Sequence, residues 1–323
     1  MRKVIFLGDP HVMPSNISES DKMMEHVEKQ GLEQGVDTVI ILGDLFHTHA
    51  ILRIEALSFW NKWFNRLTKN FKVISLVGNH DMKNQTNNSS HDNAMLGFNI
   101  PNLLIVSTPT QVDGVTFLPY IHDHNDLVSK ANSFQGRSLI AHQTFTGAQY
   151  DNGFYAKDGV DPSLFNFEQI ISGHIHKKSH VGKCFYVGTG KWDSVNDANE
   201  DKGFHTAILK DGIFTDFNFI SNKNILTSIE KVVIKEGEEV PDLQSAKVKY
   251  YIELVGTNAW IAKQKKKLKG KAQLKAKPTD RAFKVEKTGE DFKASEYAEI
   301  FKFIDGVPKD NVLQYLTGMG CQV

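Results

Sequence analysis

The chain has 323 residues, of which 40% are hydrophobic and 24% charged, and its 38 basic and 38 acidic side chains give a formal net charge of zero. This composition is that of ordinary globular proteins and excludes a uniformly basic nucleic-acid coat protein. The two cysteines, Cys184 and Cys321, lie far apart and match neither a disulfide framework nor a zinc knot. The N-terminus resembles neither a signal peptide nor a membrane span, so we expect a cytoplasmic protein without membrane contact.

The first third of the chain alternates short apolar runs with segments whose apolar side chains have helical spacing. Each of three such runs ends in a glycine followed by a polar residue. The alternation predicts an α/β fold with buried strands. In such sheets, ligands gather at the carboxyl ends of the strands. The runs are residues 3–7, 38–42 and 73–77, they lead into Gly8-Asp9, Gly43-Asp44 and Gly78-Asn79, and the helical segments begin near Ser18 and cover residues 57–67.

Further strands are expected in the rest of the chain, and two of them end in histidine, at His142 and at His174 with His176. The pattern changes near residues 220–226, after which a strand, a helix and a second strand predict a small β-α-β cap domain. The polar residues 83–93 are expected to form a mobile loop. The expected strands are residues 116–118, 138–141, 169–172, 185–187 and 206–209, then residues 249–255 and 283–285 around a helix at residues 259–269.

Side chains with the chemistry of metal ligands follow five of these strand ends. Asp9 and His11 are two residues apart in an extended segment, so their side chains point to the same side. Oxygen and imidazole donors without a thiolate favour manganese, iron or zinc over a structural zinc knot. A carboxylate that bridges two ions would hold them roughly 3.5–4 Å apart, as phosphatases and nucleases do. The candidate ligands are Asp9, His11, Asp44, Asn79, His142, His174 and His176.

Each fragment of this ligand set has an ordinary structural interpretation when it is taken alone. An Asp-x-His triplet is common, and Gly-Asp after a strand is often only a turn. The Gly-Asn-His-Asp sequence at residues 78–81 is rarer, and Gly-His-x-His at residues 173–176 is rarer still. Their occurrence in this order, each at the end of an expected strand, favours a two-metal site over coincidence.

Together the five blocks resemble the pattern of the calcineurin-like metallophosphoesterases over roughly residues 1–220. The resemblance implies an α/β (α+β) fold, a four-layer β-sandwich flanked by helices. It also implies that Asp44 bridges two ions that activate water, and that His80 contacts the phosphate and protonates the leaving oxygen. The alternative for His80 is a purely structural role. The implied ligand sets are Asp9, His11, Asp44 and His176 for one ion, and Asp44, Asn79, His142 and His174 for the other.

The residues that follow the expected bridging carboxylate narrow the resemblance. Protein phosphatases continue with Asp-Arg-Gly, whereas residues 43–47 read Gly-Asp-Leu-Phe-His and resemble the SbcD family of DNA repair nucleases. By this match, His47 would position duplex ends for exonuclease cutting. Residues 185–190 and 202–204 are also similar to short motifs of that family. His49 matches no family position, and we expect it to be a solvated loop residue.

The cap region contains a basic run on and after its expected helix. Lysines at this density attract the phosphate backbone through charge and counterion release. The alternative is a solvated helix face without a partner, and the resemblance to SbcD, whose cap contacts DNA, favours DNA binding. The candidate DNA-binding residues are Lys263, Lys265, Lys266, Lys267 and Lys269.

The sequence therefore predicts three parts. Residues 1–222 would form the nuclease domain, residues 223–290 the DNA-binding cap, and residues 291–323 a helical segment that is either ordinary core or a docking site for an ATPase partner. The expected partners are DNA, an SbcC-like SMC-type ATPase, and a second copy of the chain that pairs through the nuclease domain.

The expected activity is metal-dependent hydrolysis of DNA phosphodiester bonds, exonucleolytic on double strands and endonucleolytic on single strands. Two divalent ions would support it, with manganese expected and iron or magnesium as alternatives. The rival activity is that of a phosphatase or nucleotide phosphodiesterase of the same fold. A further alternative, an inactive scaffold that binds DNA ends, is disfavoured by the intact ligand set.

Overall fold

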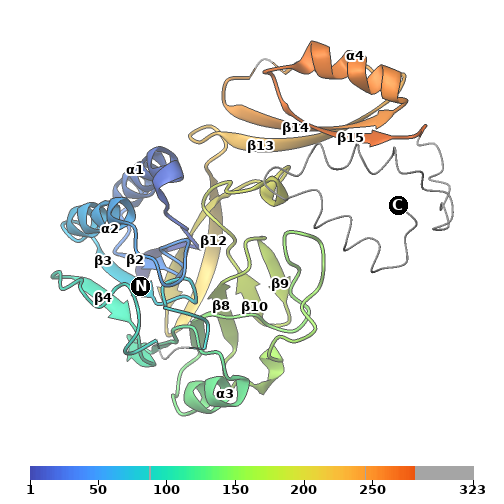
Figure 1. Cartoon of the computed structure of the whole chain (residues 1–323). Coiled ribbons are helices and arrows are strands. Elements are labelled where there is room, and N and C mark those ends of the chain that lie inside the picture. Colours follow the sequence, from blue (N-terminus) through green and yellow to red (C-terminus); the bar gives the residue numbers. More distant parts are fainter. Residues whose placement is uncertain (87–88, 244, 281–323) are drawn as a thin grey trace, which may run out of the picture.

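Two β-sheets pack face to face in the computed structural model, which describes residues 1–86, 89–243 and 245–280 (Figure 1). Within these residues, the first sheet has the strand order β12-β11-β1-β2-β3-β4, and the second has the order β5-β6-β7-β8-β10-β9. In the first sheet β1 to β4 run parallel, as do β6, β7, β8 and β10 in the second. The strands are β1 (Arg2–Leu7), β2 (Thr38–Ile41), β3 (Lys72–Leu76), β4 (Leu103–Val106), β5 (Thr110–Val112), β6 (Val115–Phe117), β7 (Ser138–His142), β8 (Gln169–Gly173), β9 (Ser179–Val181), β10 (Cys184–Tyr186), β11 (Gly203–Lys210) and β12 (Ile213–Ser221).

Helices cover the outer faces of both sheets, which gives four layers (Figure 1). α1 (Ile17–Glu33) and α2 (Ile54–Leu67) pack on the first sheet, and α2 contributes the fully buried Trp60, Trp63 and Phe64 to that interface. α3 (His124–Asn132) covers the second sheet. Between the sheets, Phe6 from β1 packs in one apolar layer with Phe117 from β6. The predicted four-layer α/β fold is therefore confirmed. Short 3₁₀ turns η1 (Pro14–Asn16), η2 (Pro162–Leu164) and η3 (Val195–Asp197) join these elements.

The strands that the sequence did not predict are mostly edge or half-exposed strands. β5 and β9 have three residues each and a partly exposed pattern, so they lack the continuous apolar run that marks a buried strand. β12 and, in the cap, β13 (Ser228–Lys235) were also missed, because polar residues interrupt their apolar pattern. β4 was missed although its sequence, Leu-Leu-Ile-Val, is a continuous apolar run. Sheet pairing, which sequence spacing does not reveal, defines these strands.

The cap is a parallel sheet of order β13-β14-β15 within the described residues, and α4 covers its face away from the two-sheet body (Figure 1). The other face meets the body, where Ile229 and Tyr251 join the core under α1 and α2. Ile261 and Leu268 anchor α4 on the sheet. The elements are β13 (Ser228–Lys235), β14 (Val248–Gly256), α4 (Asn258–Leu268) and β15 (Gln273–Pro278).

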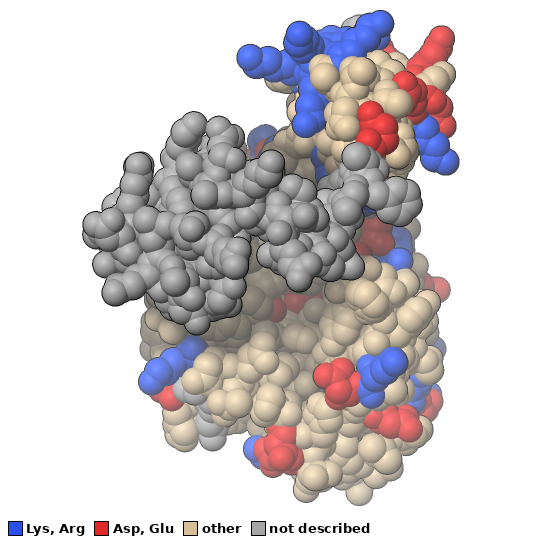
Figure 2. Space-filling view, turned by 45° about the vertical axis from the view of Figure 1, so that its right-hand side comes forward, with Lys and Arg blue, Asp and Glu red and all other residues tan. Residues whose placement is uncertain are grey.

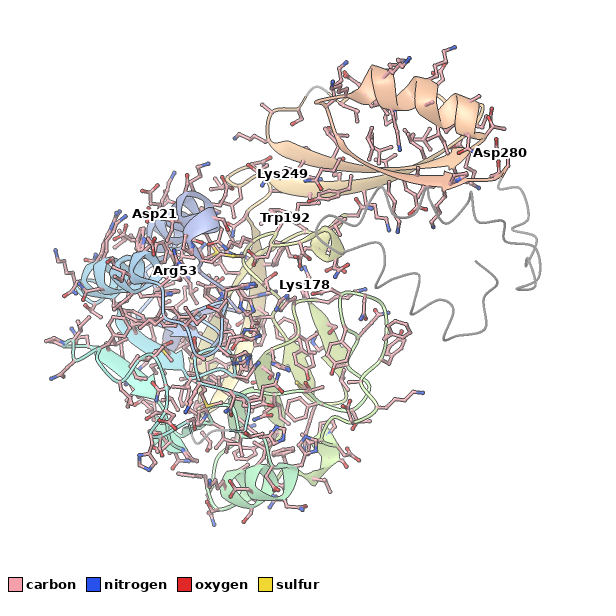
Figure 3. The ribbon with its side chains drawn as sticks, viewed as in Figure 1. Asp21, Arg53, Lys178, Trp192, Lys249 and Asp280 are labelled. Carbon is pink, nitrogen blue, oxygen red and sulfur yellow. The ribbon has the colours of Figure 1, made fainter. Side chains whose placement is uncertain are left out.

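The strand that follows α4 is β15, directly after the helix, whereas the sequence pattern indicated a strand at residues 283–285. Those residues, and the C-terminal segment at residues 291–323, lie outside the described residues. Asp280 accepts hydrogen bonds from the backbone N of Asn258 at 2.9 and 3.0 Å, which ties the end of the cap to the N-terminus of α4 (Figure 3). Lys and Arg side chains gather over the cap (Figure 2). Among the described helices, none is long and apolar enough to cross a bilayer.

His205 on β11 gives the fold a dependence on pH. Its ring packs at 5.1 Å from the rings of both Phe185 and Phe219, and its Nδ1 is buried without a hydrogen-bond partner. Burial, together with the charge of Lys178, lowers the pKa of His205 from 6.5 to about 4. The unfolded chain therefore binds one more proton than the folded chain between these two values, so stability falls as the pH drops from 6.5 toward 4.

We expect the free energy of unfolding to fall by up to about 3 kcal/mol between pH 7 and pH 4 because the unfolded chain protonates His205. In His205→Gln, which cannot take up that proton, the loss over the same interval should be smaller by this amount. Urea unfolding at several pH values measures it, with the exposed His124→Gln as the control variant. Parallel pH profiles for wild type and His205→Gln would contradict the prediction.

Candidate metal centre

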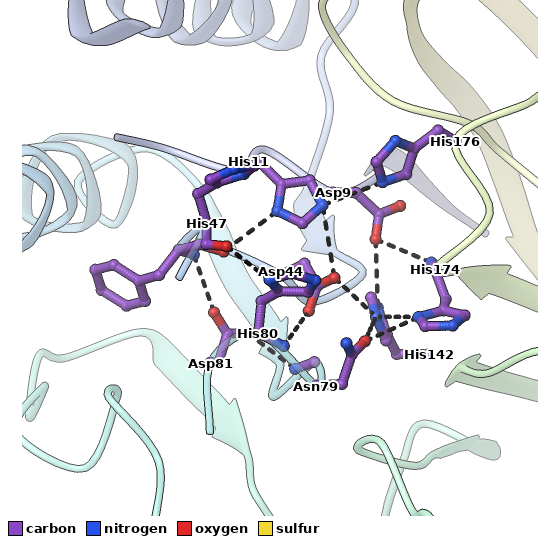
Figure 4. A network of polar contacts seen from close by, with 12 residues as sticks. Asp9, His11, Asp44, His47, Asn79, His80, Asp81, His142, His174 and His176 are labelled. Atoms are coloured by element: carbon purple, nitrogen blue, oxygen red, sulfur yellow. Dashed lines mark hydrogen bonds and ion pairs between the residues drawn. The ribbon is translucent and has the colours of Figure 1, made fainter. Parts of the chain in front are cut away.

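The seven predicted ligands converge at one edge of the two sheets, where five strands end (Figure 4). Asp9 and His11 follow β1, Asp44 follows β2, and Asn79 follows β3. The second sheet contributes the last residue of β7, His142, together with His174 and His176 after β8. Four of these residues have left-handed backbone conformations, namely Asp9 (φ 42°), His11 (φ 42°), Asp44 (φ 51°) and His174 (φ 80°). Such conformations are costly for non-glycine residues and cluster where function requires them.

Asp9, His11 and Asp44 form one cluster, in which each residue offers a ligand atom within 4.8 Å of the others. His176 joins it, because its Nε2 lies 3.1 Å from Nε2 of His11. The Nδ1 of His11 faces the carbonyl oxygen of Phe46 at 3.3 Å. A carbonyl can only accept, so Nδ1 carries the proton and Nε2 presents a lone pair to the cluster.

Asp44, His142 and His174 form a second cluster by the same criterion, so Asp44 is common to both. Its Oδ2 lies 3.6 Å from Nε2 of His11 and 3.3 Å from Nε2 of His142. Oδ1 of Asn79 lies 3.1 Å from Nε2 of His142 and 2.8 Å from Nδ1 of His174. The structure thus brings together both predicted ligand sets, with Asp44 between them as the expected bridge.

The donor atoms fit a pair of cations. Nδ1 of His142 donates to the carbonyl oxygen of Leu42 at 2.7 Å, so its Nε2 is the ring nitrogen that faces the oxygen atoms of Asp44 and Asn79. A proton on Nε2 can bond these oxygen atoms, and a cation can take the place of that proton. Oδ2 of Asp9 is buried without a hydrogen-bond partner. A buried acceptor of this kind is typical of a metal site.

The pKa shifts of the clustered residues also indicate that positive charge stabilises the site. Burial raises the pKa of Asp9 to about 6, although His142 opposes this. Burial lowers the pKa of His142, but the charge of Asp44 outweighs it and raises that pKa to about 9. Burial would raise the pKa of Asp44 as well, yet the neighbouring histidines hold it well below its usual value. Bound divalent cations would satisfy these two buried carboxylates directly.

His80 lies beside the clusters rather than in them. Its backbone N donates to Oδ1 of Asp44 at 2.9 Å, and its ring lies 4.9 Å from the ring of His11. Nδ1 of His80 donates to the carbonyl oxygen of His47 at 2.7 Å, which leaves Nε2 as the atom that can exchange a proton. Burial lowers the pKa of His80 below 6.5. This placement suits a group that acts on a phosphate held by the clusters.

His47 lies at the rim of the same group, with its ring 5.4 Å from that of His11 and 6.1 Å from that of His80. Its Nδ1 is buried and has no hydrogen-bond partner. The expectation for His49 was wrong, because its ring is half-buried and stacks on His80 at 4.4 Å. The chain bends at residues 47–50 and keeps His49 at the site, which its separation from the motif did not reveal.

Asp81 and Gly78 hold the loops after β2 and β3 together. Oδ1 of Asp81 accepts from the backbone N of Phe46 at 3.0 Å, and Oδ2 accepts from the backbone N of Gly78 at 2.9 Å. Burial raises the pKa of Asp81 to about 8. A Cβ atom at Gly78 would lie 2.2 Å from Oδ1 of Asp44, so a glycine is required for the backbone to pass this carboxylate.

A comparison with known protein families decides the assignment. Residues 2–178 match the family described as calcineurin-like phosphoesterase. The chain belongs to this family. Calcineurin-like phosphoesterases depend on divalent metal ions, so membership supports the hydrolysis of phosphoesters at the clusters described above.

Two viral proteins are similar to this phosphoesterase. Over 221 residues it is 28% identical to protein 244L of Invertebrate iridescent virus 6, which is named for an inferred phosphoesterase activity, and the match covers 65% of this chain and 77% of that protein. Over 186 residues it is 26% identical to protein 078R of Invertebrate iridescent virus 3, named in the same way, with 54% of this chain and 53% of that protein covered.

Two solved structures are more distantly similar. GAP50, the anchor in the inner membrane complex of Plasmodium, has a TM-score of 0.44 at 13% identity over 69% of this chain and 85% of its own. The purple acid phosphatase PPD1 from seeds of yellow lupin has a TM-score of 0.37 at 14% identity over 64% of this chain and 49% of its own. These similarities are too low to bear on the substrate.

Asp151 is a residue of the phosphoesterase site that the sequence did not reveal. It lies in the loop between β7 and β8, and its Oδ2 is 3.2 Å from Nδ1 of His176. Burial lowers the pKa of His176, but the hydrogen bond to Asp151 outweighs it and raises that pKa to about 8. A lone aspartate in a loop carries no motif, so only the fold identifies it. Carboxylates that bond the second nitrogen of a ligating histidine fix its tautomer and orientation.

We expect Asp151→Ala to weaken the binding of one of two divalent cations by about 10- to 100-fold, since Nε2 of His176 would lose its orientation. Asp151→Asn should have a smaller effect, because an amide oxygen can still accept from Nδ1. Titration calorimetry with manganese measures both sites. Gln149→Ala is the matched control, because Gln149 ties the same loop to Lys177 at 2.9 Å without touching His176. Unchanged manganese binding in Asp151→Ala would refute this role.

Proposed function

We propose that the chain is a DNA nuclease of SbcD type that hydrolyses phosphodiester bonds with two divalent cations, manganese first among them. The observation that carries this proposal is the position of His47. It follows Gly43-Asp44 in the pattern of the SbcD nucleases, and its side chain lies at the rim of the metal centre beside His80. A partly exposed imidazole at this rim can contact a nucleic-acid strand whose phosphate is held by the clusters.

Different residues of the chain would have different roles in hydrolysis. Bound cations would supply Lewis acidity and an activated water molecule. Asp9, His11, Asp44 and the other candidate ligands would hold them and orient the phosphate between the two sheets. His80 would deliver a proton from Nε2 to the departing ester oxygen, since its Nδ1 is engaged by the carbonyl oxygen of His47.

The test uses four substrates with manganese: duplex DNA, single-stranded DNA, a panel of nucleotides and bis-p-nitrophenyl phosphate. We expect wild type to cleave both DNA substrates and Asp44→Ala to cleave none of them. Cleavage of nucleotides or of the nitrophenyl ester without cleavage of DNA would refute the nuclease proposal and leave the phosphoesterase assignment in place. A wild type that is inactive on all four would support the scaffold alternative.

The position of the cap lysines favours a second candidate, a phosphodiesterase for small nucleotides. The five lysines of the predicted DNA-binding set are exposed on α4 and just after it, but α4 covers the face of the cap sheet away from the body (Figure 1). The metal centre lies in the body, so a short substrate bound there has no contact with α4. Only a long nucleic acid that passes over the cap could reach both.

The cap lysines yield their own prediction. Replacing Lys263, Lys265, Lys266, Lys267 and Lys269 by glutamine should weaken binding of long duplex DNA and reduce the slope of log affinity against log salt by up to about 0.9 per lost phosphate contact. Fluorescence anisotropy at several salt concentrations measures the slope. Lys22→Gln and Lys29→Gln on α1 serve as controls. An unchanged slope would mean that the lysines of α4 do not bind DNA and belong only to the solvated surface.

The proposal extends to partners that the nuclease resemblance implies. These are an SbcC-like SMC-type ATPase and a second copy of the chain that pairs through the two-sheet body. The C-terminal segment proposed for ATPase docking lies outside the described residues. Sedimentation of the full chain alone and with the candidate ATPase tests both interactions, and a monomer that does not bind the ATPase would contradict them.

A further inference from the structure

A hollow of about 380 Å³ lies beside His80, between the loop that follows β2 and the loop that follows β3. Its floor contains the buried side chains of Phe46 and Met82. Its lip is formed by Ile51 and Leu52, which are 65% and 42% exposed. Large apolar side chains that stay exposed next to a reactive centre are typical of a ligand site.

The hollow and the metal centre share His80. The imidazole ring of His80 lies 4.9 Å from that of His11 in the first cluster, and His80 also lines the hollow. Suppose that the clusters hold a phosphodiester with its leaving oxygen at His80. The group attached to that oxygen would then lie next to the hollow. In hydrolysis, water adds to phosphorus, the P–O ester bond to this group breaks, and the leaving oxygen takes up a proton.

The chemistry of the hollow limits what that group can be. Apolar side chains and an imidazole suit a flat ring, which can pack against them. Lys83 and His91 are exposed at its rim and can meet the next phosphate, while Asp92 keeps part of the rim acidic. A hollow of 380 Å³ lies at the small end of ligand pockets and has room for one nucleoside rather than a base pair.

We propose that the hollow receives the single unpaired nucleoside that departs with the leaving oxygen, so that the enzyme acts on single-stranded or frayed DNA at the scissile bond. This inference rests on the proposed nuclease function and adds its substrate form. A duplex would have to open by at least one base pair before cleavage, because a paired base does not fit between the two loops.

Dinucleotides test the inference directly. Thymidylyl-thymidine is compared with the two analogues that lack one base, either on the 5′ or on the 3′ side of the phosphate, with manganese present. We expect kcat/KM to fall by about 10-fold or more for the analogue that lacks the base on the leaving side, and to change little for the other. In the double variant Ile51→Ser, Leu52→Ser, the ratio between the intact and the abasic substrate should approach one. Leu164→Ser, which removes an exposed leucine on η2 away from the hollow, should retain the ratio.

A second readout does not depend on activity. In the wild type, 5-iododeoxyuridine placed on the leaving side of a non-hydrolysable methylene-phosphonate linkage in a single-stranded oligonucleotide should photocrosslink to peptides that contain residues 46–52, 82–83 or 91–94. Crosslinks confined to other peptides would overturn the inference.

The outcomes separate this inference from the function on which it rests. If the enzyme cleaves DNA but cleaves all three dinucleotides at equal rates, the nuclease function stands and the hollow does not bind a base. Hydrolysis of bis-p-nitrophenyl phosphate without cleavage of DNA or any dinucleotide would refute the nuclease function, and the base site with it. Faster cleavage of fully paired blunt DNA than of single strands would also overturn the requirement for an unpaired base.

Discussion

Asp44→Ala is expected to lower the rate of phosphodiester hydrolysis by about 10³-fold or more, which corresponds to about 4 kcal/mol of transition-state stabilisation. Asp44 is the carboxylate common to both clusters, and its Oδ2 lies 3.6 Å from Nε2 of His11 and 3.3 Å from Nε2 of His142. Its loss removes a ligand from both ions at once. It also removes the acceptor of the backbone N of His80 and the charge that raises the pKa of His142.

Metal binding should follow activity in this variant. Calorimetry with manganese is expected to show both cation sites weakened in Asp44→Ala, and Asp44→Asn should recover shape without recovering the charge. Asp113→Ala, which removes a surface carboxylate that pairs with Arg2 and Lys72, controls for a general loss of acidic charge. The prediction fails if Asp44→Ala binds two cations with wild-type affinity, or if its rate stays within about 10-fold of wild type.

The fold and the convergence of the candidate ligands were predictable because both depend on local sequence signals. Buried strands such as β2 and β3 are continuous apolar runs, and glycine followed by a polar residue marks their ends. Parallel strands place their carboxyl ends at one edge by topology, so Asp44 and Asn79 had to be neighbours once the strands were recognised. His142 at the end of β7 and the two histidines after β8 joined them because these strands occupy the facing sheet.

The parts that could not be predicted depend on the path of irregular segments. Asp151 reaches His176 from a loop between strands, and no spacing rule connects two residues that are 25 positions apart in sequence. His49 stacks on His80 because the loop after β2 bends at residues 47–50. The outward position of the α4 lysines follows from how the cap sheet packs on the body, which charge patterning does not determine.

The site also shows why strain and burial accompany one another here. Four candidate ligands adopt left-handed backbone conformations, and two carboxylates are buried in the same cluster. Both features cost stability in isolation. Hydrogen bonds from backbone N–H groups of the surrounding loops hold the ligands in place. One of them runs from the backbone N of His174 to Oδ1 of Asp9 at 2.9 Å. We infer that cation binding stabilises the folded chain, since it relieves the repulsion between these groups.

His80→Gln is expected to reduce cleavage of DNA by about 10²- to 10⁴-fold, the range that positioned proton transfer contributes. A deoxyribose oxygen is a poor leaving group and needs a proton, whereas p-nitrophenolate leaves without one. The same variant should therefore hydrolyse bis-p-nitrophenyl phosphate within about 10-fold of the wild-type rate. Cation binding should not change, because His80 lies beside the clusters and not within them.

The pH dependence supplies the sharper test of His80. Burial lowers the pKa of His80 below 6.5, so its Nε2 is mostly unprotonated at neutral pH and gains its proton as the pH falls through that lowered value. The ratio of DNA cleavage to bis-p-nitrophenyl phosphate hydrolysis should accordingly rise toward acidic pH in wild type and stay flat in His80→Gln. The exposed His124→Gln should behave as wild type. A wild-type ratio that is independent of pH, or equal losses on both substrates in His80→Gln, would assign His80 to phosphate positioning instead of proton donation.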